Sequence, residues 1–199
     1  MKTAIFLLFL IPTVLLSQNN DILIKELNSY ADSVDKLILD SSPWEIYCNT
    51  INTVRNERAI GIQETKISFY YKQKDDSVYE DKDGTVYFIP QYNPPLMVKI
   101  EYNIANSQTV TVKYYLNGEN YLYNFDSKGE YGNINRTFWF GKNELLRFEE
   151  KSARDEMGVM IENGKFSKDT YNESLLIKDK IEMYKNLYYD IFEISYKDK

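Results

Sequence analysis

Histidine is absent from the 199 residues of this chain. Imidazole is the usual general base beside a catalytic serine or cysteine, and it is a frequent ligand of zinc and iron. Its absence excludes these catalytic arrangements, histidine acid–base catalysis and every metal site that needs a histidine ligand. Catalysis would have to rely on carboxylates, and we expect no cofactor.

Cysteine is nearly absent as well. Cys48 is the single cysteine, so no disulfide can form within the chain. Trp44, Tyr47 and Ile51 surround it at helical spacing, and we therefore expect Cys48 to be buried on the apolar side of a helix. The alternative is an exposed thiol that is free to pair with another chain.

Basic residues are outnumbered, because 24 lysines and arginines face 30 aspartates and glutamates, for a formal net charge of −6. An acidic chain repels phosphate backbones, and no stripe of basic residues interrupts this pattern. Nucleic acid is therefore not an expected partner.

A long hydrophobic run occurs only at the N-terminus. Residues 4–16 are apolar apart from one threonine, follow Met1-Lys2 and precede the small residue Ser17, which is the order of a secretory signal. The run is shorter than the ~20 residues that span a bilayer, and no cysteine follows it to carry a lipid. We expect a signal peptide at residues 1–17, one exported domain at residues 18–199 that is periplasmic or secreted, and no membrane anchor.

The segment after this leader has the apolar period of an amphipathic helix over residues 21–39. The sequence Ser42-Pro43-Trp44-Glu45 resembles a helix start and predicts a second helix to about residue 57. Because the β-branched, asparagine-rich run at 49–54 argues against that helix, the helical region at 21–57 contains either one helix or a pair.

Between residues 65 and 151 apolar side chains recur at every second position, as in half-buried antiparallel strands. Turn sequences such as Asn117-Gly118 separate the strands. A final helix is predicted at residues 170–192, opened by the capping box from Thr170 to Glu173. We therefore predict an α+β fold, an antiparallel meander of about six or seven strands flanked by these helical regions.

A weak internal repeat lies in the meander. Tyr114-Tyr115-Leu116-Asn-Gly-Glu-Asn-Tyr121-Leu122 aligns with Phe138-Trp139-Phe140-Gly-Lys-Asn-Glu-Leu145-Leu146, and a looser copy begins at Val86-Tyr87-Phe88. These hairpins, an aromatic pair and an apolar residue followed by an Asn/Gly turn and leucine, resemble those of exported bacterial proteins of unknown function. The resemblance covers residues 85–150, implies fold and export, and carries no catalytic residue.

The strand period places aromatic residues of the meander on a common face. If alternation holds, this face carries Tyr115, Tyr121, Tyr123 and Trp139, with Lys113 and Arg147 among them. Flat rings with hydrogen-bonding tips suit sugars, peptides or protein partners. The alternative is that the C-terminal helix covers this face and buries it.

Acidic residues offer two further candidates. The loop sequence Asp81-Lys82-Asp83-Gly84 is similar to part of a calcium loop, although the full ligand spacing is missing and a solvated hairpin loop is the better interpretation. Glu101, Glu149 and Glu150 lie on predicted strands and could supply the two carboxylates that glycoside hydrolysis needs.

These observations favour a non-enzymatic, exported protein that binds a protein or a glycan through the aromatic face or through hairpin loops. One alternative is a hydrolase that works through paired carboxylates on a glycan. The other is an inhibitor or immunity-type protein, which needs only a binding surface. If the aromatic face is buried, the loops at 74–83, 90–95 and 152–168 are the segments available for such roles, and the oligomeric state stays open.

Overall fold

The computed structural model describes residues 2–40, 45–57, 61–80, 82–104, 107–130, 132–142, 144–152 and 159–197. Within these residues the chain forms two helices and ten strands. They are α1 (Lys2–Asp40), β1 (Tyr47–Glu57), β2 (Gly61–Tyr71), β3 (Gln73–Glu80), β4 (Val86–Tyr92), β5 (Met97–Ile104), β6 (Gln108–Asn117), β7 (Asn120–Gly129), β8 (Ile134–Gly141), β9 (Glu144–Ser152), β10 (Val159–Asn163) and α2 (Lys168–Lys197).

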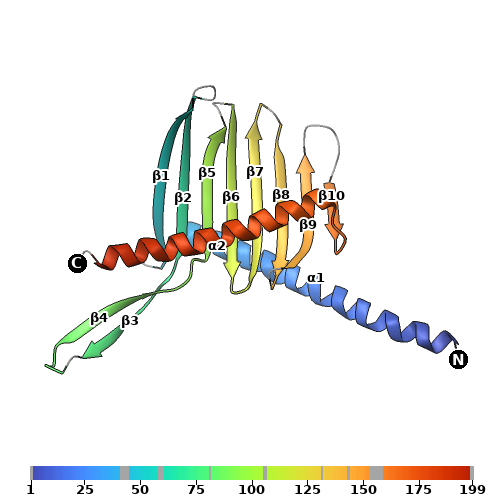
Figure 1. The fold of residues 1–199 in the computed structure, drawn as a ribbon, viewed down its shortest axis with the longest axis horizontal. Coiled ribbons are helices and arrows are strands. Elements are labelled where there is room, and N and C mark those ends of the chain that lie inside the picture. The colour runs from blue at the N-terminus through green and yellow to red at the C-terminus, as the bar shows by residue number, and fades with distance from the viewer. Residues whose placement is uncertain are drawn as a thin grey trace.

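Eight of the strands form one open sheet in the order β1-β2-β5-β6-β7-β8-β9-β10 (Figure 1). Every neighbouring pair is antiparallel, so the sheet is a meander with β1 and β10 at its edges. The predicted α+β class, the meander and the two flanking helices are confirmed. The sheet has eight strands where six or seven were predicted.

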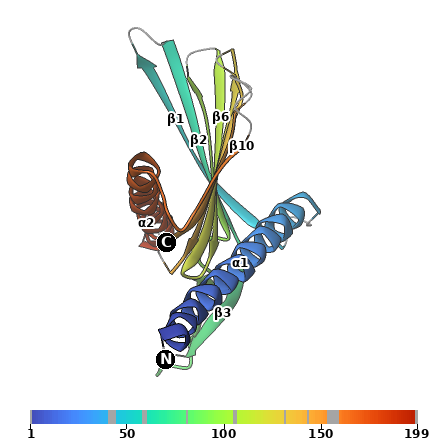
Figure 2. The ribbon, with the colours of Figure 1, turned by 90° about the vertical axis from the view of Figure 1, so that its right-hand side faces the viewer.

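The two helices cross opposite faces of the sheet. Figure 2 shows α1 on one side of the sheet and α2 on the other, while the part of the strands at the top of this view extends beyond both helices. Because a sheet residue alternates between the two faces, aromatic residues contribute to two separate cores. The molecule is thus a three-layer arrangement in which only part of the sheet is covered.

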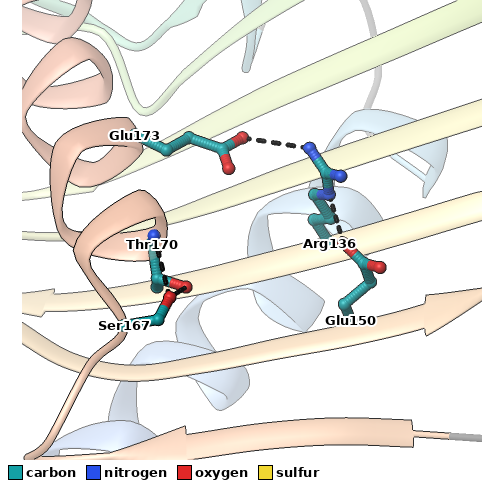
Figure 3. Close-up of polar contacts among 5 residues, drawn as sticks. All are labelled: Arg136, Glu150, Ser167, Thr170 and Glu173. Carbon is teal, nitrogen blue, oxygen red and sulfur yellow. Dashed lines mark hydrogen bonds and ion pairs between the residues drawn. The ribbon is translucent and has the colours of Figure 1, made fainter.

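The core beneath α2 is rich in aromatic side chains. From the helix it takes Ile177, Ile181 and Tyr188, which recur at the spacing of one helical face. Residues from six central strands complete it, including Phe69, Val98, Val112, Tyr114, Tyr121, Tyr123, Phe138, Phe140 and Phe148. Ser167 caps this helix, since its hydroxyl oxygen accepts a hydrogen bond from the Thr170 N–H (Figure 3).

The core beneath α1 is smaller. Its helical members are Ile24, Leu27, Ala31 and Val34, and its sheet members are Met97, Tyr115, Leu122 and Trp139. Gly141 at the end of β8 permits the close approach of the helix, because a Cβ atom at this position would lie 2.6 Å from Cδ2 of Leu23.

Residues 47–57 form an edge strand, so the second predicted helix is wrong. β1 pairs with β2 along its whole length, from Tyr47 opposite Tyr71 to Glu57 opposite Gly61. The β-branched run that argued against a helix fits the pleated strand. The expectation for Cys48 is also wrong, because its side chain is exposed on this strand. Trp44 lies outside the described residues.

A two-stranded hairpin, β3 with β4, stands apart from the main sheet between β2 and β5 (Figure 1). Val86-Tyr87-Phe88, where the looser copy of the repeat begins, is the start of β4 in this hairpin. Asp83 is exposed in its turn, and Asp81 lies outside the described residues. Where the structure describes the chain, no three Cys, Asp or Glu residues gather as metal ligands, and no helix is long and apolar enough to cross a membrane.

Candidate functional site

The structure divides the predicted aromatic set between the two faces of the sheet. Tyr115 and Trp139 lie in the core beneath α1, and Tyr121 and Tyr123 lie in the core beneath α2. All four are buried, with exposed fractions of 7% or less. The prediction of a common face is therefore wrong for Tyr121 and Tyr123, and these four residues form no open aromatic surface.

The hairpin between β6 and β7 explains this division. Asn117 pairs with Asn120 across a two-residue loop, which sets Tyr115 opposite Leu122. Directly opposed residues lie on the same face of a sheet. The even-numbered residues of β7 therefore share a face with Tyr115, and Tyr121 and Tyr123 lie on the other face. Leu122 in turn pairs with Trp139, and Trp139 pairs with Arg147, so these residues form one row across the sheet.

A polar hollow of about 390 Å³ lies where α1 meets this row. We call it the α1 hollow. Its helical wall and its sheet floor are made of Asn28, Ala31, Asp32 and Asp35 from α1 and of Tyr115, Leu122, Asn124, Thr137, Trp139, Glu149 and Lys151 from β6 to β9.

The two aromatic rings of the floor are fixed by hydrogen bonds to α1. Trp139 donates its indole N–H to Oδ1 of Asn28 over 2.8 Å, and Tyr115 donates its hydroxyl to Oδ2 of Asp35 over 2.8 Å. Burial raises the pKa of Tyr115, and the adjacent Asp35 carboxylate raises it further, so the hydroxyl stays a donor. These rings anchor the helix and leave the polar groups around them to face the hollow.

Apart from Asp32, the charged residues in and beside the hollow are paired with one another. Lys113 lies 2.7 Å from Asp35, while the carboxylate of Glu149 contacts Arg147 at 3.2 Å and Lys151 at 2.9 Å. Arg147 also stacks over Trp139, with its guanidinium carbon 5.3 Å from the ring centroid. The hollow is thus strongly polar and close to electrically balanced.

A row of hydrogen-bonding side chains crosses the sheet floor. Asn124 pairs with Thr137, and Thr137 pairs with Glu149, so an amide, a hydroxyl and a carboxylate lie side by side on neighbouring strands. The Oδ1 atom of Asn124 is shielded and has no hydrogen-bond partner among the described residues. A buried acceptor without a partner is unfavourable, but an atom without solvent exposure is not open to a ligand. The groups of this row that a ligand can contact are the other polar atoms of half-buried Asn124, Thr137 and Glu149.

A larger hollow, of about 500 Å³, lies on the same face beside β1, β2, β5 and β6. Polar groups in its lining are already hydrogen-bonded or ion-paired with residues of the sheet. The Asn103 side chain accepts from the Glu64 N–H and donates to the Ile62 carbonyl, and Glu101 is paired with Lys99 at 2.7 Å. We therefore place the candidate site in the smaller α1 hollow.

The three carboxylates predicted for glycoside hydrolysis are not brought together. Glu149 faces α1, whereas Glu150 faces α2. There Glu150 forms an ion pair with Arg136 at 2.5 Å, and Arg136 also contacts Glu173 at 3.3 Å (Figure 3). Glu101 lies in β5, four strands from β9 in the sheet order. At ~4.8 Å per strand this is a separation of about 19 Å, well beyond the ~5–10 Å of a catalytic pair.

Comparison with known proteins adds nothing to this geometry. No protein-family model, curated protein or solved structure matches the chain. The function is therefore inferred from the side chains of the site alone.

Sequence reasoning missed the helical wall of the hollow and the middle of its floor. Asn28, Asp32 and Asp35 recur at four- and three-residue steps along α1, beside the apolar stripe that packs on the sheet. A polar stripe at the flank of a core helix is ordinarily solvated, so this spacing alone did not indicate a site. In the floor, Asn124 lies beside Thr137 only because of the register in which β7 pairs with β8, and this register was not predicted from the sequence.

Proposed function

We propose that the protein is an exported, non-enzymatic binding protein whose α1 hollow takes a neutral, polyhydroxylated ligand, a segment of a glycan. The observation that carries this proposal is the row of half-buried Asn124, Thr137 and Glu149, which lines the hollow with an amide, a hydroxyl and a carboxylate on neighbouring strands. Sugar hydroxyls both donate and accept hydrogen bonds, and they complement a row that offers an amide, a hydroxyl and a carboxylate.

The charge balance of the hollow supports a neutral ligand. Lys113 and Lys151 are engaged with carboxylates, so neither is a free cation for a phosphate or a carboxylate ligand. Asp32 has no ion pair within the described residues and adds an acceptor for ligand hydroxyls. A volume of about 390 Å³ falls within the ~300–1,000 Å³ of typical small-ligand sites.

The accessible chemistry favours a glycan over a protein surface at this site. Protein interfaces are enriched in tyrosine, tryptophan and arginine and depleted in lysine and glutamate. Here Tyr115 and Trp139 are buried, and the accessible polar side chains are amide, hydroxyl, carboxylate and ammonium groups. This distribution supports hydrogen-bonded recognition of a small polar ligand.

Export remains part of the proposal and rests on the leader at residues 1–17 and on the resemblance of the hairpins at 85–150. The described core contacts of α1 run from Leu23 to Ile38. Cleavage after Ser17 would therefore leave these contacts in place.

Calorimetry with a panel of neutral oligosaccharides tests the proposal. We expect saturable binding that weakens roughly tenfold or more in Thr137→Val and in Asn124→Ala, because each removes one hydrogen-bonding group. Thr111→Val, on the same face of β6 but outside the hollow, is the matched control and should bind like the unchanged protein. Equal affinity of all variants, or no binding across the panel, would overturn the proposal.

The same samples separate the proposal from a carboxylate hydrolase. A hydrolase would release reducing ends from the bound oligosaccharide, and Asp32→Asn would abolish the release while binding persists. We expect no release from any bound oligosaccharide.

A further inference from the structure

Removal of the leader decides which residue begins the mature chain. Ser17 is the small residue that separates the apolar run at residues 4–16 from the polar residues after it, so cleavage there makes Gln18 the new N-terminus. An N-terminal glutamine can close a five-membered ring between its α-amino group and its own side-chain amide. The neighbours Asn19 and Asn20 have a shorter side chain, which would need a strained four-membered ring. Cleavage at Ser17 therefore exposes the one residue of this segment that can cyclise.

The new terminus lies ahead of the part of α1 that packs on the sheet. The N-terminal end of the helix extends beyond the sheet (Figure 1), and the described core contacts of the helix begin at Leu23. Between Gln18 and this contact, Asn19, Asp21 and Ile22 are exposed. The first residues of the mature chain are therefore open to solvent and are not held in place by the core.

We propose that Gln18 cyclises to pyroglutamate once the leader has been removed, an inference that rests on the export part of the proposed function. The neutral α-amino nitrogen attacks Cδ of its own side chain, and the bond between Cδ and Nε2 breaks. The attacking nitrogen gives one proton to the departing amide nitrogen, which leaves as ammonia, and it becomes the N–H of a lactam. Gln18 supplies every atom of this step, so no co-reactant is needed.

An uncharged terminus suits the beginning of a helix. A free α-amino group is largely protonated at neutral pH, and a cation is unfavourable beside the N–H groups of the first helical turn. The lactam nitrogen carries no charge, so Asp21 is left as the charged residue of this turn, where a carboxylate is favourable. Cyclisation thus removes an unfavourable charge from the helix that forms the wall of the α1 hollow.

The modification also protects the exposed end of the chain. Aminopeptidases act on a free α-amino group, and chain ends that are not packed are preferred sites of proteolysis. The residues before Leu23 form such an end in the mature protein. A lactam at Gln18 removes the group that these enzymes need, so the first turn of the mature α1 stays intact.

Mass spectrometry of the mature protein, exported from the full chain with its leader, tests this inference. We expect the mass of residues 18–199 less one ammonia, with the loss assigned to an N-terminal fragment whose α-amino group is blocked. This assignment excludes a loss of ammonia from an asparagine elsewhere in the chain. Gln18→Asn is the matched control, because it keeps a neutral amide after the same leader and should give the full mass and a reactive α-amino group.

A mature chain that begins at Gln18 with a free α-amino group would overturn the inference and leave export intact. A retained leader, or cleavage at another residue, would overturn the inference together with the exported location. Treatment with an aminopeptidase is the second readout: it should shorten Gln18→Asn toward Leu23 and leave the unchanged protein intact, and equal shortening of both would also overturn the inference. None of these readouts involves ligand binding, so cyclisation and the α1 hollow can fail independently.

Discussion

Trp139 in β8 donates its indole N–H to Oδ1 of Asn28 in α1 over 2.8 Å, and this bond joins the helix to the floor of the α1 hollow. The indole is 6% exposed, so the N–H has little access to water if Asn28 is lost. The same pair therefore fixes both the position of the helix and the shape of the proposed site.

We expect Asn28→Ala to lower the free energy of unfolding by about 1 kcal/mol, because it leaves a buried donor without an acceptor. Asn28→Asp keeps an oxygen at the same position and should cost less. Urea unfolding measured by tryptophan fluorescence in a Trp44→Phe background compares the two variants. Equal losses in both would show that the hydrogen bond contributes nothing measurable.

A second contact controls how closely α1 approaches the sheet. A Cβ atom at Gly141 would lie 2.6 Å from Cδ2 of Leu23 and 3.0 Å from Cδ1 of Leu146. Gly141→Ala should therefore cost about 1–2 kcal/mol through overpacking. The loss should shrink in a Leu23→Ala background, because that variant removes the obstructing methyl groups.

Gly118→Ala is the matched control for this cycle. Gly118 has a φ of +65° in the β6–β7 turn and open space around its Cα, so its cost of about 1 kcal/mol comes from the backbone alone. Its effect should be additive with Leu23→Ala in the same urea measurement. An additive result for Gly141 as well would contradict the close packing of α1 on β8.

The meander could be predicted from the sequence because a half-buried antiparallel strand has an apolar side chain at every second position, and this pattern is visible in the sequence. The register was harder. Treating odd positions in β6 and β7 as one face misplaced Tyr121 and Tyr123, although a two-residue loop at Gly118-Glu119 reverses the parity across the hairpin. That rule was available in the sequence, since Asn117-Gly118 signals such a turn.

The second predicted helix failed for a different reason. Tyr47 and Ile51 are four residues apart, and this spacing shares a face in a helix and also in a strand. The cap-like sequence before them favoured the helix, while the β-branched residues Thr50, Thr53 and Val54 favoured the strand. Pairing with β2 decided the outcome, and a pairing partner cannot be read from a local window.

The α1 hollow could be predicted least. Sequence reasoning proposed Tyr115 and Trp139, and these lie in its floor, but as buried supports. The hydrogen-bonding row of Asn124 and Thr137 exists only because the register places β7 beside β8. Polar residues on strands ordinarily face solvent, so neither had a signal of its own.

Cys48 provides a direct test of the edge strand. Its thiol is exposed on β1, so we expect a thiol reagent to modify the folded protein at a rate similar to that of the urea-unfolded chain. A Cys48→Ser variant gives the background of the assay. Protection of the thiol until the protein unfolds would favour the buried helical position that the sequence predicted.

The final prediction concerns alkaline pH. Tyr30 in α1 donates its hydroxyl to the Leu116 carbonyl over 2.8 Å, and burial raises the pKa of Tyr30 from 10.0 to about 12. Because the pKa is higher in the folded state, the folded protein favours the neutral phenol. This stabilisation is complete below pH 10 and is lost as the pH rises from 10 to 12.

Tyr30→Phe isolates this effect. The variant should be about 1 kcal/mol less stable at neutral pH, because the Leu116 carbonyl loses a donor. Its stability should then fall less steeply than that of the unchanged protein between pH 10 and 12, since one titrating group has been removed. Urea unfolding at several pH values measures the pH dependence of stability for both proteins. Burial also raises the pKa of Tyr114, Tyr121 and Tyr123, so both proteins will lose stability between pH 10 and 12. If the free energy of unfolding falls equally steeply with pH in Tyr30→Phe and in the unchanged protein, the prediction is contradicted.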